Sequence, residues 1–294
     1  DSDQGIGLSF RRLAILDLSD AGSQPMCSVS GRYVICFNGE IYNHNDIRKE
    51  IERKSLSKII WNGHSDTETL LASIELFGLE ETLKKCTGMF AIALWDKKEK
   101  LLSLTRDRFG EKPLYYCLAK RSLIFGSELK ALRAFPEFET TIDHKVIPLF
   151  MKFNYIPAPF CIYKDCYKLM PAEIISFKIQ NKSCEKIEQK IFWSAKSIIK
   201  SSQSNPVKCF DDAKVMIESA LEKSVKSQMI SDVPLGAFLS GGIDSSLITA
   251  LMQKNSMDKI QTFTAKFESS SLDESKIAKN VADYLGSSNI NVTV

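Results

Sequence analysis

The feature that most constrains the fold is a regular alternation of apolar and amphipathic segments after residue 208. VPLGAFL (233–239) predicts a buried strand, SGGIDSS (240–246) a tight turn, and the residues from there to Lys254 a helix. The same order of strand, helix and strand follows in residues 261–294. Parallel strands need long crossover connections, which are usually helices, so we expect an α/β domain built on a parallel sheet.

The first 193 residues show a different pattern, in which short strands follow one another through turns. RYVICF (32–37) is rich in β-branched and aromatic residues and is expected to end at the turn Asn38-Gly39-Glu40. A capping box at Ser65 and Glu68 predicts a helix. Further strand pairs are expected at 89–96 with 101–107, at 113–119 with 122–126, and within 173–193.

Residues 194–207 separate the two patterns. They are rich in Ser and Lys, include Pro206 and show little sustained periodicity. We therefore expect a linker at 194–207 between one domain at 1–193 and a second at 208–294.

Composition excludes several classes of protein. The sequence has 39 Lys and Arg against 36 Asp and Glu, interspersed along the chain, which predicts no binding to nucleic acid or to an anionic membrane. No apolar run approaches the roughly 20 residues that span a bilayer. The 8 cysteines form no CxxC pair and the 3 histidines no close ligand pair, so we expect a cytoplasmic protein without protein-held zinc.

The turn SGGIDSS has the residues of a phosphate-binding loop. Backbone N–H groups at a helix start attract anions, and Gly241 and Gly242 would let the backbone approach phosphate oxygens. Asp244 would repel phosphate unless Mg²⁺ lay between them, so its presence implies a metal-bridged nucleotide. A plain capped turn is the alternative. Hydroxyl groups that can add donors belong to Ser240, Ser245 and Ser246.

This loop resembles the pyrophosphate loop of the ATP pyrophosphatases that activate substrates by adenylation. The resemblance implies cleavage of ATP between the α and β phosphates, with the leaving pyrophosphate and its Mg²⁺ held by the loop and by Asp244. It also implies that Leu239 lies beside the nucleotide and Ala265 beside the adenine. The implied nucleotide-binding residues are Leu239, Ser240, Gly241, Gly242, Asp244, Ser245, Ser246 and Ala265.

Candidate site residues of the first domain are Arg12, Asn38, Gly39 and Asp66. Taken singly, each also has a plain structural explanation, as an edge-strand charge, a hairpin turn or a first-turn carboxylate. Their surroundings, however, resemble the class II glutamine amidotransferase domain of glutamine-hydrolysing asparagine synthetases, and with SGGIDSS the resemblance covers nearly the whole chain. The stretches that carry it, in chain order, are FNGEIYNH, GHSDTE, GMFAIALWD, RDRFGEKPLYY and FGSELKAL.

The resemblance implies an α+β fold like that of the N-terminal-nucleophile hydrolases, an αββα sandwich, followed by a truncated α/β nucleotide-binding domain. It implies that Arg12 binds the glutamine carboxylate, that Asp66 and Glu40 hold the ammonium group, and that Asn38 and Gly39 form the oxyanion hole. Residues implied to line the same pocket are Arg12, Leu13, Ala14, Ile15 and Leu16.

The activity so implied is the ATP-dependent conversion of aspartate to asparagine through an acyl-adenylate, with ammonia from glutamine, and with ATP and Mg²⁺ as cofactors. The family's nucleophile is an N-terminal Cys whose α-amine acts as base. Because the sequence begins at Asp1 and Cys27 is internal, we expect an inactive internal fragment that lacks the nucleophile and most of the synthetase domain. A homodimer stays open, as do two alternatives: another acceptor, such as a sugar acid of surface polysaccharides, and a non-catalytic homologue.

Overall fold

The computed structural model describes residues 3–55, 58–119, 122–180, 183–204, 206–267 and 273–293. It divides into two compact units, Asp1–Ser201 and Ser202–Val294. The segment expected as a linker, 194–207, contains helix α6 (Ala195–Ser202), and the domain limits proposed from the sequence stay a proposal. The residues 120–121 and 181–182, expected to connect two strand pairs, lie outside the described residues.

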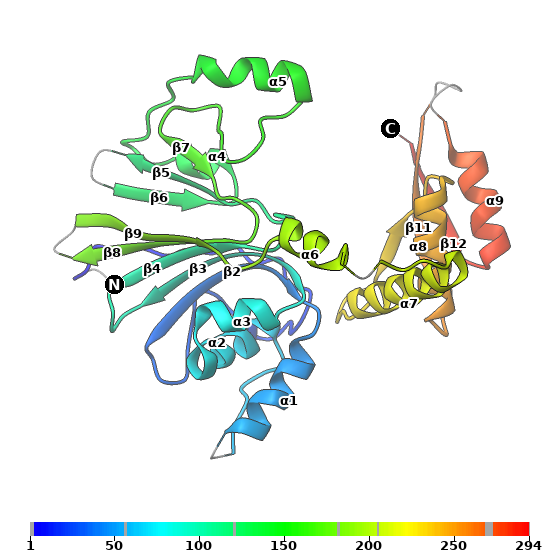
Figure 1. Cartoon of the computed structure of the whole chain (residues 1–294), viewed down its shortest axis with the longest axis horizontal. Coiled ribbons are helices and arrows are strands. Elements are labelled where there is room, and N and C mark those ends of the chain that lie inside the picture. Colours follow the sequence, from blue (N-terminus) through cyan, green and yellow to red (C-terminus); the bar gives the residue numbers. More distant parts are fainter. Residues whose placement is uncertain are drawn as a thin grey trace. The chain divides into compact units, whose positions relative to one another are not determined.

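The first unit is built on an antiparallel six-stranded sheet with the order β1-β2-β3-β4-β8-β9 (Figure 1). A second, three-stranded antiparallel sheet has the order β6-β5-β7. The strands of the large sheet are β1 (Met26–Cys27), β2 (Tyr33–Ile41), β3 (Gly88–Asp96), β4 (Leu101–Arg106), β8 (Glu173–Gln180) and β9 (Ser183–Ile191). Those of the small sheet are β5 (Tyr115–Ala119), β6 (Ser122–Gly126) and β7 (Cys166–Lys168).

Alternate residues of β2 face two different cores, as the period of two along a strand requires. Ile35 and Phe37 belong to a core between the large sheet and the helices α1 (His44–Lys54), α2 (Asp66–Phe77) and α3 (Leu79–Lys85). Cys36 belongs to a second core, which lies between the two sheets and includes Phe125 of β6. A third core joins the far face of the small sheet to Leu132 of α4 (Leu129–Arg133).

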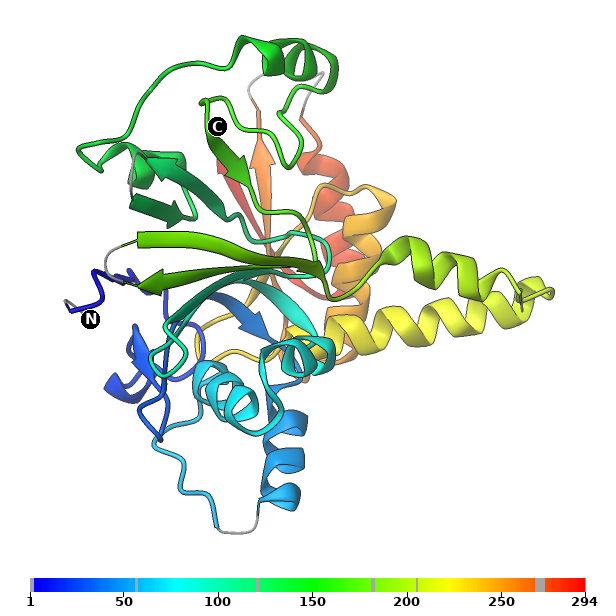
Figure 2. The ribbon, with the colours of Figure 1, turned by 60° about the vertical axis from the view of Figure 1, so that its left-hand side comes forward.

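These cores define four layers in the order helix, sheet, sheet, helix. Figure 2 shows the cyan helices α2 and α3 on one side of the large sheet and strands β5 and β6 on the other. The order is that of the αββα sandwich expected from the sequence.

The segment Asn38-Gly39-Glu40 is part of strand β2, so its assignment as a turn was wrong. β2 continues to Ile41 and pairs with β3 along its whole length, with Gly39 opposite Phe90 and Ile41 opposite Gly88. An Asn-Gly pair favours a turn only where the chain reverses, and here the ladder with β3 extends the strand.

Capping of helix α2 follows the sequence pattern. The Ser65 hydroxyl accepts a hydrogen bond from the Glu68 N–H at 3.2 Å. The helix ends at Gly78, whose φ of 80° belongs to the left-handed region that favours glycine. Helix α2 therefore begins at Asp66, directly before a polar loop and beside the end of β2.

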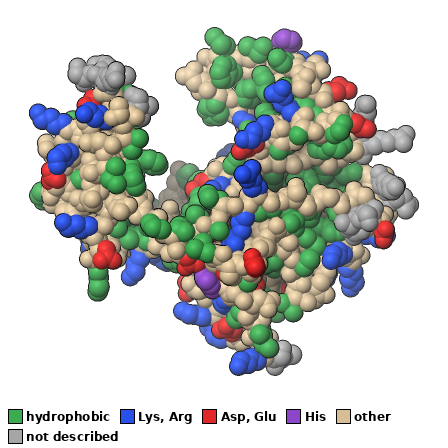
Figure 3. Space-filling model, turned by 180° about the vertical axis from the view of Figure 1, so that it is seen from behind, with side chains coloured by type: hydrophobic (Ala, Val, Ile, Leu, Met, Phe, Trp, Pro, Cys, Tyr) green, Lys and Arg blue, Asp and Glu red, His purple; other side chains and the backbone are tan. Residues whose placement is uncertain are grey.

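Helix α5 (Ile147–Phe153) buries none of its residues. It follows a short 3₁₀ turn, η2 (His144–Val146), and another 3₁₀ turn, η1 (Asp20–Gly22), precedes β1. In the space-filling view, hydrophobic side chains gather over this part of the first unit, at the top of Figure 3. Exposed apolar side chains there include Ile147, Phe150, Met151, Phe153, Tyr155 and Phe160.

The second unit has a parallel three-stranded sheet with the order β10-β11-β12, as the alternation of segments predicts. Helix α8 connects β10 to β11, and α9 connects β11 to β12. The elements are α7 (Phe210–Gln228), β10 (Gly236–Phe238), α8 (Ile243–Lys254), β11 (Gln261–Lys266), α9 (Ser275–Leu285) and β12 (Ser288–Thr293).

Strand β10 is shorter and more exposed than VPLGAFL suggests. Only residues 236–238 form the strand, and the Phe238 side chain is 88% exposed. The reason is that β10 lies at an edge of the sheet, where it pairs with β11 and with no other strand of the described residues. Leu239, which follows it, is buried against Ala278 and Ala282 of α9.

Candidate functional site

The Arg12 side chain is held by carbonyl groups of its own segment. Its Nη2 donates to the carbonyl oxygens of Leu16 at 2.6 Å and of Asp17 at 2.7 Å. A Cβ added at Gly22 would lie 2.3 Å from this Nη2, so the guanidinium occupies the space that a side chain at position 22 would need. The segment from Arg12 to Asp17 is therefore wrapped around the guanidinium group.

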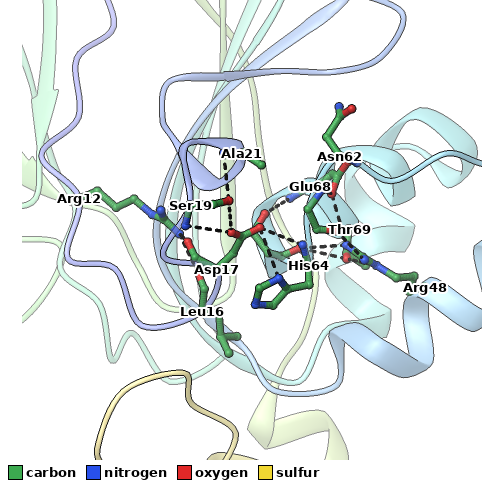
Figure 4. A network of polar contacts seen from close by, with 12 residues as sticks. Arg12, Leu16, Asp17, Ser19, Ala21, Arg48, Asn62, His64, Glu68 and Thr69 are labelled. Carbon is green, nitrogen blue, oxygen red and sulfur yellow. Dashed lines mark hydrogen bonds and ion pairs between the residues drawn. The ribbon is translucent and has the colours of Figure 1, made fainter.

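Asp17 organises this segment and was missed by the sequence analysis (Figure 4). It is 1% exposed, and its φ of 59° lies in the left-handed region, which Asp tolerates better than most residues. Its Oδ1 accepts from the N–H of Ser19 at 3.1 Å and from the Ser19 hydroxyl at 2.5 Å, and its Oδ2 accepts from the N–H of His64 at 2.8 Å. Burial would raise the pKa of Asp17, but these hydrogen bonds outweigh it and hold the pKa below its ordinary value.

The loop before helix α2 is fixed by Arg48, a residue of α1 (Figure 4). Its guanidinium donates to the carbonyl of Gly63 at 3.0 Å and to the Thr69 hydroxyl at 3.1 Å. The Glu68 carboxylate accepts from the N–H groups of Asn62 at 2.7 Å and Gly63 at 3.1 Å. These contacts determine where α2 begins, and therefore where the Asp66 side chain lies.

Asp66 is the first residue of α2 and is 5% exposed. Its Oδ2 accepts a hydrogen bond from the N–H of Ile41, at the end of β2, at 2.8 Å. Burial raises the pKa of Asp66 to about 6, against the opposing effects of hydrogen bonds from backbone N–H groups and of the positive charge of Arg12. A carboxylate this deeply buried favours a cationic partner.

Glu40 lies on β2 next to Ile41 and shares this environment. Burial and the negative charge of Asp66 raise the pKa of Glu40 to about 7, and the charges of Lys112 and Arg12 partly offset them. Arg12 thus acts electrostatically on both Glu40 and Asp66. The Asp66 carboxylate contacts the backbone of β2 directly after Glu40, and the positive charge of Arg12 affects both carboxyl groups.

Asn38 and Gly39 precede Glu40 on the same strand. The Asn38 amide donates to the Ser127 hydroxyl at 3.3 Å, a contact that the sequence does not predict. A Cβ at Gly39 would lie 2.1 Å from the carbonyl oxygen of Met89 and 2.7 Å from the Cα of Phe90. Only glycine allows the backbone of β2 to approach β3 so closely at this position.

The remaining residues of the predicted glutamine pocket differ in exposure. Leu13 is 84% exposed, Leu16 is buried, and Ala14 and Ile15 are half-buried. Leu16 contributes its carbonyl to Arg12 rather than its side chain. No signal in the sequence distinguished backbone contacts from side-chain contacts along 12–16. Asp17 could have been found, because an Asp two residues before a Ser is typical of a local side-chain-to-backbone turn.

In the second unit, four predicted residues line one cavity of about 270 Å³: Leu239, Ser240, Ser245 and Ala265. The cavity lies at the carboxyl ends of β10 and β11, where parallel α/β sheets bind ligands. Other lining residues are Phe238, Phe263, Thr264, Phe267 and Glu274.

The geometry of the loop suits an anion. The Ser240 hydroxyl lies 3.0 Å from that of Ser245 and accepts from the N–H of Gly242 at 3.3 Å. Gly242 precedes the first turn of α8 and has no side chain to cap it, so a bound anion can accept from the N–H groups there. Gly241 has a φ of 83°, and a Cβ there would lie 2.7 Å from Cγ2 of Ile277.

Four predicted loop residues do not line that cavity: Gly241, Gly242, Asp244 and Ser246. The Ser246 hydroxyl is buried without a hydrogen-bond partner among the described residues, beside a separate apolar cavity between α8 and α9. Asp244 is exposed in the first turn of α8. The described residues hold no cluster of three or more metal-ligating side chains, so Mg²⁺ would need Asp244 together with phosphate oxygens. The serine hydroxyls, the glycines and the helix start fit a nucleotide's phosphates.

Among the described residues, no helix has the length and apolar character needed to cross a bilayer.

Comparison with protein families gives two matches. A family described as "Glutamine amidotransferase domain" matches residues 2–193, and one described as "Asparagine synthase" matches residues 216–294. The chain belongs to the glutamine-hydrolysing asparagine synthetase family. This confirms the resemblance found in the sequence, and with the four layers of the first unit it confirms an α+β fold of the N-terminal-nucleophile hydrolase type.

Curated members of this asparagine synthetase family are similar over nearly the whole chain. "Asparagine synthetase [glutamine-hydrolyzing] 1" of Bacillus subtilis is 35% identical over 304 residues, which cover 99% of this chain and 44% of that protein. "Putative asparagine synthetase [glutamine-hydrolyzing] 2" of Methanocaldococcus jannaschii is 33% identical over 296 residues, which cover 95% of this chain and 54% of that protein. The chain thus spans about half the length of the curated relatives it matches.

Proposed function

We propose that this chain carries the glutamine site and the pyrophosphate loop of an ATP-dependent amidotransferase that makes asparagine from aspartate. The observation that carries the proposal is the contact of the Asp66 carboxylate with the N–H of Ile41, on the strand that also holds Asn38, Gly39 and Glu40, with the charge of Arg12 acting on both carboxyl groups. Family membership and the relatives' names support the same activity.

Recognition of glutamine follows from the charges of this site. The guanidinium of Arg12 would bind the α-carboxylate, a charge-assisted contact. The carboxylates of Asp66 and Glu40 would bind the α-ammonium, which offsets the cost of burying two negative charges together. A zwitterion therefore complements both signs of charge in the site.

Amide hydrolysis requires donors that stabilise the oxyanion of the tetrahedral intermediate. The Asn38 amide and the N–H of Gly39 would provide them, and the contact of Asn38 with Ser127 would orient the amide. We assign the nucleophile's role to no cysteine of the described residues. Cys27 is exposed on β1 and Cys36 is buried between the two sheets.

The second unit would bind the nucleotide. Ser240, Ser245 and the N–H groups at the start of α8 would hold the pyrophosphate end, while Leu239 and Ala265 would contact the rest of the nucleotide. Ser246 and the two glycines shape the loop, and Asp244 would be the side-chain contact of Mg²⁺. ATP with Mg²⁺, when bound, supplies the phosphoanhydride whose cleavage activates the acceptor carboxylate as an acyl-adenylate.

The same proposal includes a cytoplasmic location and domains at 1–193 and 208–294.

The test uses two variants of the full-length enzyme. Arg12→Ala should lose glutamine-driven synthesis and keep synthesis from added ammonia, because ammonia enters after the first site. Loss of a charge-assisted contact of about 1.5–3 kcal/mol predicts a roughly 10- to 150-fold weaker use of glutamine. Asp244→Ala should lower pyrophosphate release with either nitrogen source and keep glutamate release.

Three outcomes would contradict the proposal. One is a loss of ammonia-driven synthesis in the Arg12 variant as large as its loss of glutamine-driven synthesis, which would show that the two activities do not use separate sites. Another is normal pyrophosphate release by the Asp244 variant, which would deny the phosphate role of the loop. The third is a lack of amide product when aspartate is the acceptor and both half-reactions are active.

A further inference from the structure

Three cysteines, Cys117, Cys161 and Cys166, belong to the apolar core on the far face of the small sheet. Cys117 of β5 lies directly opposite Cys166 of β7 in the antiparallel register. The three cysteines belong to one cluster of buried side chains, and Cys161 and Cys166 line the same cavity.

The three thiols are buried, with exposed fractions of 5% for Cys117, 3% for Cys161 and 4% for Cys166. Burial of single cysteines is ordinary, because a thiol packs as a small apolar group. Here, however, each thiol has another thiol as its neighbour. Among the described residues, no group of three or more His, Cys, Asp or Glu side chains is arranged to hold a metal ion.

A cavity of about 280 Å³ reaches two of the thiols. It is lined by Cys161 and Cys166 and by side chains of both charges, among them Lys145, Lys164 and Asp165. A small polar oxidant can enter such a cavity. Cys117 does not line it.

The thiols are also unequal. The hydrogen bond from Cys166 lowers the pKa of Cys161, with smaller help from the N–H groups of Tyr163 and Ile162 and from the charge of Lys168, against the effect of burial. The neighbouring Cys161 thiol, burial and the Cys117 thiol, in that order, raise the pKa of Cys166. Attack on a peroxide needs a thiolate, so Cys161 is the member of the pair suited to react first.

We propose that Cys161 and Cys166 form a peroxide-sensitive dithiol that closes to a disulfide. The Cys161 thiolate attacks one oxygen of hydrogen peroxide, the O–O bond breaks, and a sulfenic acid and hydroxide result. The Cys166 sulfur then attacks the sulfenic sulfur, an S–S bond forms, and its thiol proton and the departing hydroxyl leave as water. In sum, two thiols lose two electrons to one peroxide, and two waters form.

The experiment treats the fully reduced full-length protein with graded hydrogen peroxide at pH 7.5. Free thiols are blocked under denaturing conditions, and peptide mass spectrometry then maps the disulfides. We expect a Cys161–Cys166 disulfide that forms at least about tenfold faster than oxidation of Cys86, which is equally buried and whose pKa burial raises to about 12. Cys86 is thus the internal control.

Two variants separate the steps. Cys166→Ser keeps a hydrogen-bond donor beside Cys161 but removes the second sulfur, so a sulfenic acid should accumulate at Cys161 and react with dimedone. Cys184→Ser, which changes a half-buried thiol on β9, should leave the disulfide unchanged. The proposal is overturned if wild-type Cys161 and Cys166 stay reduced while Cys86 is oxidised. It is also overturned if Cys161 forms no sulfenic acid in the Cys166 variant.

Discussion

Replacement of Asp17 by Asn tests whether this buried carboxylate holds the segment around Arg12. Asn has nearly the same shape and also tolerates the left-handed backbone, so strain at φ 59° is not introduced. The amide has one oxygen where the carboxylate has two. Whichever way the amide turns, its NH₂ group faces a donor, either the N–H of His64 or the N–H and hydroxyl of Ser19.

The magnitude follows from those contacts. One hydrogen bond to a charged acceptor, worth about 1.5–3 kcal/mol, is lost in a buried place. We therefore expect the free energy of unfolding to fall by about 2–3 kcal/mol. Asp20→Asn is the matched control, because Asp20 is exposed in the same segment and should change stability by less than about 0.5 kcal/mol.

Urea unfolding followed by tryptophan fluorescence reports on the first unit, because Trp61, Trp95 and Trp193 all lie in it. The difference between wild type and Asp17→Asn should also depend on pH. The pKa of Asp17 is lowered in the folded chain, so its stabilising effect is complete above the ordinary value of 3.8 and disappears as the pH falls through the lowered pKa. Equal stability of the Asp17 and Asp20 variants at pH 7 would refute this account.

Further predictions concern the two sites. Gly39→Ala should lower the free energy of unfolding by more than about 2 kcal/mol, since its Cβ would lie 2.1 Å from the Met89 carbonyl. Gly7→Ala is the control, because a Cβ there meets nothing within 4 Å, and equal stabilities of the two variants in urea would contradict the prediction. In the full-length enzyme, the KM for glutamine should fall between pH 6 and 8 as Glu40, with a pKa of about 7, ionises toward the ammonium group, and Glu40→Gln should remove this trend. Without glutamine, ionisation of Glu40 should instead lower the free energy of unfolding. Its raised pKa contributes stability that is complete below pH 4.5 and is lost as the pH rises through about 7. Glu40→Gln should therefore be more stable relative to wild type at pH 8 than at pH 4.5, in the same urea assay. Gly241→Ala should reduce ATP-dependent pyrophosphate release without changing the tryptophan-detected unfolding, because its φ of 83° and its contact with α9 lie in the second unit.

Much of the fold was predictable because local patterns and tertiary structure agree. The capping box before α2 and the alternation of strands and helices in the second unit both identify the correct elements. The predictions failed where distant parts of the chain decide. Asn38-Gly39 has the composition of a turn, yet pairing with β3 keeps it in a strand. Phe238 belongs to an apolar run, yet its strand lies at a sheet edge.

The candidate site was predictable at its charged residues and not at the groups that support them. Arg12 and Asp66 were identified through sequence resemblance, and their shared environment depends on the fold. The contact of Asn38 with Ser127 joins residues 89 positions apart, and no local pattern encodes such a pairing. Asp17 holds its segment through side-chain contacts with Ser19 and His64. The spacing of Asp17 and Ser19 predicts the first contact, whereas His64 lies 47 positions away and its contact depends on the fold.

The close approach of the phosphate loop to helix α9 restricts which sequences this fold can accept. A Cβ at Gly241 would lie 3.0 Å from the backbone nitrogen of Ala278, and Ala278 itself is completely buried. A side chain at position 241 would push the loop away from the helix, and a larger side chain at position 278 would displace Leu239, which directly precedes the loop. The effects of substitutions at positions 241 and 278 on stability should therefore be coupled. A library randomised at these two positions should return only small residues at both.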